Sequence, residues 1–541
     1  MRSLFITFFS FILCLPSYSK QLEYDICVYG ETASGVVAAI AGAREGQKVV
    51  LISKNSHVGG MATSGLTATD MNSHSRIGGI AREFYGNIYQ YYLNPDAWKN
   101  QTREAFMEST LKRTFTGKND KTQIQWVYES HVAEEIMLNM LKEANVEILF
   151  NQRIALDKEV IKENQKITSI VLEDGTIVSA KIFIDASYEG DLLAKSGVSY
   201  TFGRESNKQY GETLNGIRFE NSNKQFDVSP YLKENDPSSG LLPFIEPEIW
   251  GNEGDADSRT QAYCYRVTLT SDQANKVEIK KPKNYNPLWY EIIARKLKQD
   301  PDQKLTQIIT ITPMPNKKTD TNHLDFIGAS YDYAEANYER RKEIEEMHKN
   351  YALGLLWFLG NDKRVPKHIR SEMKTWGLAK DEFQDSENFP YQIYVREGRR
   401  MVGEFVMTER NVERHNRIHA AHSIGLGTYS LDCHEVSRVA TSDAKIKVDG
   451  DIYISTTPYQ ISYYSIVPRL NECTNLLVPV CLSASHVAYS TIRMEPVYMV
   501  LGQSAGIAAS IAIKNNQPVQ GISYSELRET LLRKDQILEV K

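Results

Sequence analysis

Residues 24–52 read YDICVYGETASGVVAAIAGAREGQKVVLI, and this stretch decides the fold. An apolar run with β-branched residues, 24–29, is followed by a glycine turn, by alanine-rich helical spacing over 36–44 and by a second apolar run, 49–52. A strand, a glycine turn, a helix and a strand within about thirty residues form a βαβ unit. The sequence therefore predicts an α/β fold with a Rossmann-like dinucleotide-binding domain.

The turn of this unit departs from the G-x-G-x-x-G pattern, whose glycines bring backbone close to a pyrophosphate at a helix N-terminus. Gly30 and Gly35 are present, but Thr32 replaces the middle glycine. The acidic residue expected after the second strand, which accepts ribose hydroxyls, is also missing, and Ser53 and Lys54 stand there. Ser53 can bond a hydroxyl, while Lys54 is either a phosphate contact or a solvated charge. A buried βαβ unit without a nucleotide is the alternative.

The next segment indicates which nucleotide binds. Residues 57–65 read HVGGMATSG. A nicotinamide-binding unit needs no such run, whereas the flat ring system of a flavin needs bare backbone to lie against. The run therefore favours FAD, and His57 beside it raises the alternative of a covalent flavin link.

Periodicity and turn residues predict the remaining organisation. We expect a helix over 129–144, a strand over 146–150, and a hairpin of 167–172 and 176–184 turned at Asp174-Gly175. The predicted units are a signal peptide (1–19), the N-terminal part of the FAD-binding domain (20–200), an inserted α+β substrate region with a charged helix near 338–350 (201–447), and a C-terminal part that completes the FAD-binding domain and ends in a helix over 493–514 (448–541).

The composition bounds the class of protein. The 541 residues carry a net charge of −5, so no basic field favours nucleic acid as a partner. Residues 1–19 combine a short basic start, an apolar run of about a dozen residues and a small-x-small cleavage site, which predicts a Sec-type signal peptide and a periplasmic or secreted protein. We expect no membrane span, since no later run of about eighteen apolar residues is evident. The five cysteines beyond the signal include at least one free thiol, and Cys27 is expected to be buried.

Six segments, in order across nearly the whole chain, resemble the bacterial FAD-dependent oxidoreductase family with the glutathione-reductase-like FAD fold, whose exported members are often labelled xanthan lyase. The segments are VYGETASGVVAAIAGAREGQKVVLI, HVGGMATSGL, FIDASYEGDLLAKSGVSYTFGRES, VREGRRMVGEFVMTERNV, DCHEVSR and NLLVPVCLSASHVAYSTIRMEPVYMVLGQSAGIAAS.

The resemblance implies roles for particular residues. The pyrophosphate is expected at Gly30, Thr32, Ala33, Ser34 and Gly35, and the adenosine ribose at Ser53 and Lys54. The flavin and ribityl chain are expected along Gly59, Gly60, Met61 and Thr63, and the adenine at Ile154. Asp185, Ala186 and Ser187 correspond to the strand end that closes the site, and the N-terminus of the last helix is expected to face the pyrimidine side of the flavin.

Hydride transfer also needs an acid or base and cationic groups beside the substrate. The candidates are His486, Arg493, His434 and Arg399. For each the alternative is structural: His486 ties a loop to backbone, Arg493 binds the flavin pyrimidine, and the charged run around Arg399 forms surface ion pairs. Cys433, beside His434, invites a reactive-thiol hypothesis. No metal ligand set is indicated.

The electron partner and the substrate are less constrained. Because the chain has one dinucleotide unit, a pyridine nucleotide is not expected, and electrons pass to or from oxygen, a quinone or a cytochrome. A small polar substrate is expected, and the tyrosines at 453, 459, 463 and 464 are compatible with stacking on a carbohydrate. The alternatives are a polysaccharide lyase, as some family labels say, and a non-catalytic binding protein with a flavin fold.

Overall fold

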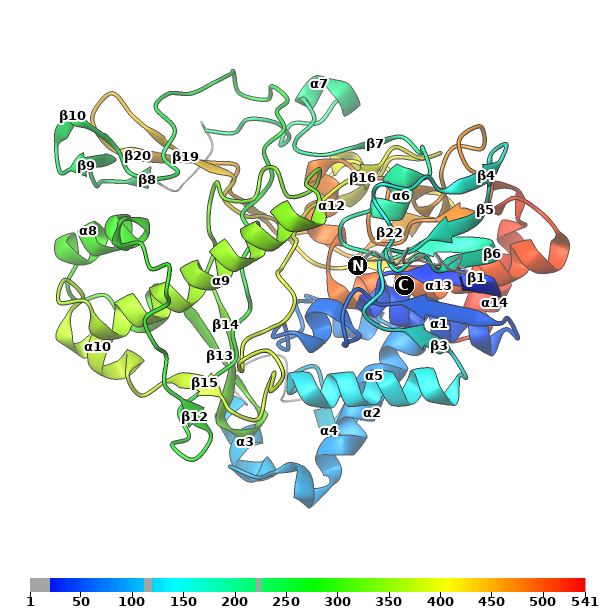
Figure 1. Ribbon diagram of the computed structural model, residues 1–541, viewed down its shortest axis with the longest axis horizontal. Coiled ribbons are helices and arrows are strands. Elements are labelled where there is room, and N and C mark those ends of the chain that lie inside the picture. Colours follow the sequence, from blue (N-terminus) through cyan, green and yellow to red (C-terminus); the bar gives the residue numbers. More distant parts are fainter. Residues whose placement is uncertain (1–19, 111–118, 220–224, 541) are drawn as a thin grey trace, which may run out of the picture.

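The computed structural model describes residues 20–110, 119–219 and 225–540, so the predicted signal peptide lies outside the described residues. Figure 1 shows two lobes. One contains the parallel sheet with helices α1 (Ala33–Arg44), α5 (Ser130–Glu143) and α13 (Glu495–Asn515). The other contains a second sheet with α8 (Glu291–Gln299), α9 (Tyr338–Asn361) and α10 (Lys367–Met373).

The first lobe is organised by a sheet in the order β3-β2-β1-β6-β5-β4, with β23 paired to β6. These strands are β1 (Gln21–Tyr29), β2 (Val49–Ile52), β3 (Glu147–Leu149), β4 (Ile161–Glu163), β5 (Lys166–Val171), β6 (Ile177–Asp185) and β23 (Leu476–Leu477). β1 lies parallel to β2 on one side and to β6 on the other. Such a switch point leaves a crevice at the carboxyl ends of the strands, where ligands bind in this class of fold. The predicted α/β fold with a Rossmann-like domain is confirmed.

Two long buried helices, α1 and α13, pack directly on each other. A Cβ on Gly502 would lie 2.2 Å from the Ser34 oxygen, and one on Gly506 would lie 2.4 Å from the Ala38 oxygen, so glycine permits the approach. Contrary to the expectation from the sequence, α13 is long and apolar enough to cross a membrane by length and composition. Since 94% of its apolar window is buried, α13 is a core helix.

The second lobe has the predicted α+β character. Its sheet has the order β12-β15-β11-β14-β13, with antiparallel pairs throughout. The strands are β11 (Leu269–Thr270), β12 (Lys276–Val277), β13 (Thr310–Met314), β14 (Lys318–Asn322) and β15 (Gly377–Ala379). The charged helix expected near 338–350 extends to Asn361 as α9.

Smaller strand pairs pack on α13 and on α12 (His486–Ile492). β17 (Ser423–Gly427) pairs with β22 (Tyr459–Ser462), so one strand pair spans the predicted boundary at residue 447, which stays a prediction. β18 (Leu431–Cys433) pairs with β21 (Ile452–Ile454) beside α12. The helix expected over 493–514 is α13, which begins at Glu495, and the short helix α12 precedes it, with Arg493 and Met494 between them.

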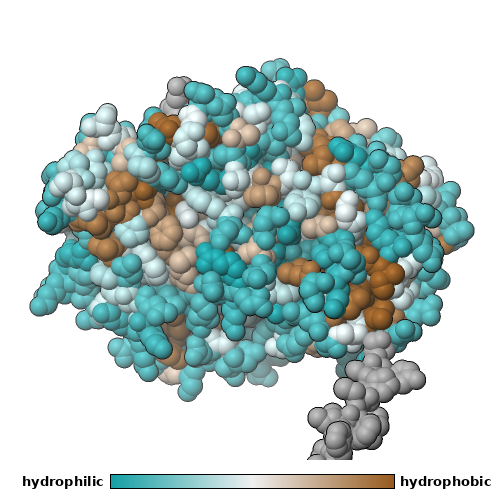
Figure 2. Space-filling view, turned by 45° about the horizontal axis from the view of Figure 1, so that its top comes forward, coloured by the Kyte–Doolittle hydropathy of each residue, from teal (hydrophilic) through white to brown (hydrophobic). Residues whose placement is uncertain are grey.

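All five described cysteines are buried and unpaired, which confirms the predicted free thiol and the buried Cys27. The face shown in Figure 2 is largely hydrophilic, with separate apolar patches.

Candidate cofactor and substrate site

The glycine loop joins the ends of β1 and β6. Gly30 has φ +107°, and a Cβ there would lie 2.4 Å from the Ser187 nitrogen. Thr32 caps α1: its hydroxyl accepts from the Gly35 N–H at 3.2 Å and donates to the Ala186 oxygen at 2.7 Å. The departure from a middle glycine therefore has a local reason, because the threonine fixes the helix start to the end of β6.

The second glycine run lies against the first. A Cβ on Gly60 would lie 2.5 Å from the Tyr188 hydroxyl and 3.1 Å from Thr32 Cα. The Gly59 N–H donates to the backbone carbonyl oxygen of Glu31 at 2.6 Å, and the Met61 N–H donates to the Tyr188 hydroxyl at 3.0 Å. Thr63 is buried and donates to the Val58 oxygen at 2.5 Å. The two runs that the sequence singled out form one compact cradle.

A cavity of about 460 Å³ opens beside this cradle, lined by Gly30, Thr32, Lys54, Ser187 and residues from the first turns of α9. The Lys54 ammonium lies 2.9 Å from Glu189 Oε1, and its backbone N–H donates to Glu31 Oε2 at 3.3 Å. Burial lowers the pKa of Lys54, but Glu189 and Glu31 outweigh burial and raise it. Glu31 and Glu189 provide carboxylates beside the cavity, whereas the position after β2 has none. Glu31 stands inside the glycine loop, a position where the dinucleotide pattern requires no carboxylate.

Three residues that were predicted to contact the cofactor make contacts within the protein instead. The Ser53 hydroxyl is buried and bonds the carbonyls of Asn55 and His57, so it does not face the cavity. Ile154 packs in the core and is absent from the cavity lining among the described residues. Asp185 accepts from the Ser187 hydroxyl at 2.6 Å and so orders the strand end.

The helix starts fit a long dinucleotide. Ala33 and Ser34 form the first turn of α1. Gly502 lies beside Ser34. Gly502 is the eighth residue of α13, whereas Ser34 is the second residue of α1. The N-terminus of α13 therefore extends about six residues, or about 9 Å, beyond the N-terminus of α1. Both N-termini carry partial positive charge, and the start of α13 has no side-chain cap. The residues therefore fit FAD: the start of α1 would hold the pyrophosphate, and the start of α13 would face the flavin.

Buried polar atoms without partners gather near the start of α13. Among the described residues, Arg493 Nε, Arg396 Nε and Glu495 Oε2 are buried and make no hydrogen bond. Since buried polar groups are nearly always paired, such atoms point to a bound group.

A charged cluster lies at the same place. His434 Nδ1 lies 2.9 Å from Asp325 Oδ2, and its Nε2 lies 3.5 Å from Asp432 Oδ2. Arg493 reaches Asp432 at 3.1 Å, and Arg396 reaches Asp325 at 2.6 Å. The structure thus brings together two predicted candidates, His434 and Arg493, with two carboxylates: Asp432, which opens the DCHEVSR segment, and Asp325, which no sequence motif marks.

The charges of this cluster favour a protonated histidine. Burial and the Arg396 charge lower the pKa of His434, but Asp325 and Asp432 outweigh them and the net shift is upward. Burial raises the pKa of Asp432, but His434 and Arg493 hold it well below its usual range. The imidazole is therefore a proton donor beside two ionised carboxylates, and it is part-exposed.

Glu495, the first residue of α13, is a second proton-holding group. Its Oε1 accepts from the Tyr188 hydroxyl at 2.7 Å, and its Oε2 has no hydrogen-bond partner among the described residues. Burial raises the pKa of Glu495 to about 8, although the Tyr188 hydrogen bond opposes the shift. Its carboxyl therefore holds a proton at neutral pH. Glu495 lies in the last of the six family-like segments but was not among the sequence candidates.

His486 lies in a buried network behind the cluster. Its Nδ1 is 2.7 Å from Glu397 Oε2, and Gln261 links Glu397 to the backbone of His434. Arg400 bonds both Glu397 and Glu205. This arrangement favours a role in positioning over direct contact with substrate.

The alternative explanation of the arginine run, that it forms surface ion pairs, is wrong, because its charges are buried. Arg396, Glu397 and Arg400 are each 0% exposed, because each charge has a partner within the protein. Arg399 is also buried, and it pairs with Asp191 at 2.8 Å and Glu335 at 2.7 Å. Asp191 lines the 460 Å³ cavity, so Arg399 supports the cavity wall rather than the His434 cluster.

The covalent flavin link at His57 and the reactive thiol at Cys433 find little support. His57 is held by Glu134 and Asp385, each 2.9 Å from one of its two ring nitrogens. Cys433 is buried and is not in a disulfide.

Glu129, His131 and Glu382 are spaced to hold a metal ion, but Lys318 fills the position. Its ammonium lies 2.8 Å from Glu129 and 2.7 Å from Glu382, so we assign no metal there.

Comparison with known proteins adds one decisive finding. A family model described as FAD dependent oxidoreductase matches residues 25–531. No curated protein matches the chain.

Solved structures resemble parts of the chain. OxyS anhydrotetracycline hydroxylase from Streptomyces rimosus is 11% identical, with a TM-score of 0.22 over 34% of this chain and 36% of that one. L-amino acid deaminase from Proteus vulgaris is 12% identical, with a TM-score of 0.23 over 39% and 55%. Glycine oxidase from Bacillus cereus is 15% identical, with a TM-score of 0.21 over 36% and 66%. Each match covers less than two thirds of the solved chain.

Proposed function

The chain belongs to the FAD-dependent oxidoreductase family, and on that premise we propose that it is an exported enzyme that transfers a hydride between flavin and a small polar, carbohydrate-derived substrate. The supporting observation is the His434 cluster, which lies at the start of α13 through the Arg493–Asp432 ion pair. When bound, FAD supplies a ring that accepts or donates a hydride.

The protein side chains supply the proton that accompanies the hydride. When the substrate is reduced, the His434 imidazolium donates the proton that the substrate's carbonyl oxygen gains. In the reverse direction, the neutral imidazole accepts it from a hydroxyl. Asp325 holds the ring in place at 2.9 Å, and Arg493 provides a fixed positive charge for the substrate oxygen.

We expect His434→Gln to slow flavin reduction by the substrate by about 100-fold, since a positioned acid or base contributes on the order of 10² to 10⁴ in rate. Rapid-mixing absorbance under anaerobic conditions measures this rate. His415→Gln, at an exposed histidine, is the matched control. An unchanged rate in His434→Gln, with flavin still bound, would remove His434 from the chemistry.

A carbohydrate-derived substrate is supported by Tyr453. This residue pairs directly with Asp432 across β18 and β21, and directly paired residues share one face of a sheet. Tyr453 is 66% exposed, so its ring stands free beside the charged cluster. An aromatic ring next to carboxylates suits a ligand with an apolar ring face and hydroxyl groups. Tyr459 and Tyr463, in contrast, are buried in the core.

We expect Tyr453→Ser to raise KM for the substrate by about 5-fold to 20-fold with little change in kcat, because loss of a stacking contact weakens ground and transition state alike. Ile454→Ser is the control, since Ile454 is exposed on the opposite face of the same strand. Equal effects in the two variants would count against stacking.

The direct test of the function is optical. Purified protein should show the visible absorption bands of flavin, and sugars, polyols and hydroxy acids are then screened for anaerobic bleaching. Protein without flavin would contradict the proposal. Cleavage of polysaccharide without bleaching favours a lyase, and flavin that no candidate reduces favours a binding protein. Reoxidation by oxygen, a quinone or a cytochrome identifies the electron partner.

Export is supported by residues 1–19. N-terminal sequencing of protein from the periplasm or medium should begin at Lys20 or Gln21, whereas an intact N-terminus on cytoplasmic protein would contradict export.

A further inference from the structure

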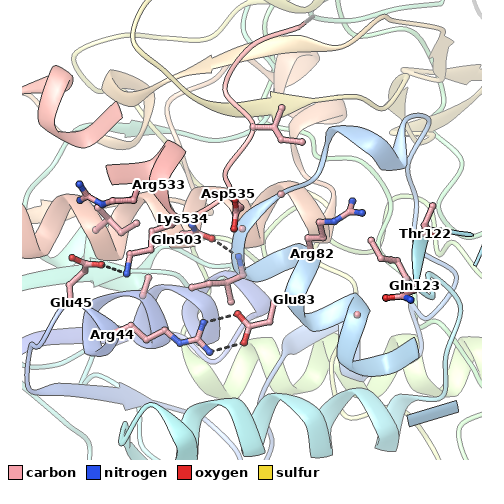
Figure 3. A pocket seen from close by; sticks show the side chains of 18 residues that line it. Arg44, Glu45, Arg82, Glu83, Thr122, Gln123, Gln503, Arg533, Lys534 and Asp535 are labelled. Carbon is pink, nitrogen blue, oxygen red and sulfur yellow. Dashed lines mark hydrogen bonds and ion pairs between the residues drawn. The ribbon is translucent and has the colours of Figure 1, made fainter. Parts of the chain in front are cut away.

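A cavity of about 810 Å³ lies away from the cofactor cradle and is used by none of the chemistry above. It is bordered by the C-terminal end of α1, the start of α2 (Gly79–Leu93), the middle of α13 and the segment after α14 (Tyr524–Arg533). Figure 3 shows this cavity from close by. Gln503 on its wall is eight residues, or about 12 Å, along α13 from Glu495.

The start of α2 packs closely against two residues that line this cavity, Asp535 and Gln503. A Cβ on Gly78 would lie 2.1 Å from the Asp535 oxygen, and one on Gly79 would lie 2.2 Å from Gln503 Oε1. Two N–H groups of the helix start are used: Gly79 donates to the Asp535 oxygen at 3.0 Å, and Ile80 donates to Gln503 Oε1 at 2.6 Å. The side chain of Gln503 is therefore fixed in orientation.

The other end of that amide has no partner. Gln503 is 1% exposed, and its Nε2 makes no hydrogen bond within the described residues. A buried N–H donor left unpaired is unfavourable, so the position favours an oxygen acceptor. The positive end of α2 reinforces this preference for a negatively charged oxygen.

The charged residues around the cavity also favour an anionic ligand. Arg44 forms a two-fold bond to Glu83, and Lys534 pairs with Glu45, as the dashed lines in Figure 3 show. Arg82 is exposed, and its guanidinium makes no hydrogen bond or ion pair in the part of the chain that the structure describes. The lining also has polar groups from Thr122, Gln123, Arg533 and Asp535. Its aliphatic part comprises Ala41, Ile80, Ile124, Ile507 and Ile537.

We propose that this cavity is a second ligand site, separate from the FAD site, that binds an organic anion with an apolar body, such as an aromatic or medium-chain carboxylate. Arg82 and the Gln503 amide, both in the cavity lining, are the donors available to the anionic oxygens, and the apolar body covers the isoleucines. Such a ligand pairs the free guanidinium, satisfies the orphaned amide and removes aliphatic surface from water.

The probe is 8-anilinonaphthalene-1-sulfonate, an apolar anion that fluoresces when shielded from water. It is titrated into the full-length protein in the presence of excess FAD, and octanoate is then added as competitor. We expect saturable binding of one dye molecule, displacement by octanoate and no displacement by octanol. Dye binding that is seen only in FAD-free protein would assign the dye to the cofactor cavity and overturn the proposal, as would octanol competing as well as octanoate.

Two variants locate the site. Arg82→Gln, at an exposed position, should weaken dye and octanoate binding by about 3-fold to 10-fold. Gln503→Glu keeps the acceptor for Ile80 but replaces the donor with an anionic oxygen, and it should weaken binding by at least about 10-fold. Arg414→Gln, at an exposed arginine elsewhere, is the matched control and should bind like wild type.

Unchanged binding in Arg82→Gln, or equal loss in Arg414→Gln, would overturn the assignment even if Gln503→Glu does not fold. Because this titration measures no flavin reduction, its failure is distinguishable from failure of the proposed oxidoreductase function.

Discussion

Gly30→Ala is expected to yield a protein that purifies with less than about a tenth of the wild-type flavin content. At this position a Cβ would lie 2.4 Å from the Ser187 nitrogen and 2.6 Å from the Ala186 carbonyl carbon, both of which are backbone atoms. The loop must therefore separate from the end of β6, which moves the cradle at the start of α1. Flavin content is measured by absorbance after release from a known amount of protein.

The control for this change is Gly46→Ala. Gly46 also has positive φ, +87°, but nothing lies within 4 Å of a Cβ built there. Both variants carry the same left-handed strain of roughly 1 to 2 kcal/mol, and only Gly30→Ala adds the clash. Comparable flavin content in the two variants would show that the contact between the loop and Ser187 does not shape the cofactor site.

Glu495→Gln is expected to become more stable relative to wild type as the pH rises. Burial raises the pKa of Glu495 from its ordinary 4.5 to about 8. Between these values the folded protein holds a proton that the unfolded chain releases, so the stability of wild type falls as pH increases through this window. The stabilisation is fully present below about 4.5 and is lost above about 8, whereas glutamine does not titrate.

The size of this effect follows from the shift. The rise from 4.5 to about 8, about three and a half pKa units, corresponds to roughly 5 kcal/mol between the ends of the window. The difference in Tm between wild type and Glu495→Gln is measured from about pH 5 to about pH 9, so that other titrating groups cancel. Glu248→Gln, at an exposed position, is the control and should show a constant difference. A constant difference for Glu495→Gln would mean that its carboxyl is ionised in the folded protein.

Local patterns predicted the nucleotide-binding part well. The strand at 49–52 is β2 as predicted, and the expected hairpin around Asp174-Gly175 is the β5–β6 pair. The expected helix at 129–144 is α5, one residue shorter at each end. These elements follow from hydrophobic spacing and turn residues within short windows, which is information that a single sequence contains.

The chemical site was predicted less completely. His434 and Arg493 are candidates from the sequence, but Asp325 is separated from His434 by 109 residues and has no local pattern around it. Ser53 shows the opposite error: its position after β2 suggested a ribose contact, and its hydroxyl turns towards the carbonyls of Asn55 and His57.

The sequence by itself determined the βαβ unit, the likeness to an FAD-dependent family and the two glycine runs that meet in the cradle. Only the tertiary structure decided which charges are buried and paired. It placed Arg396 and Arg400 in the interior, Arg399 at the cavity wall and Asp325 beside His434. The physical reason is that helix and strand patterns depend on neighbours along the chain, whereas the charge state of a buried group depends on partners that folding brings from distant segments.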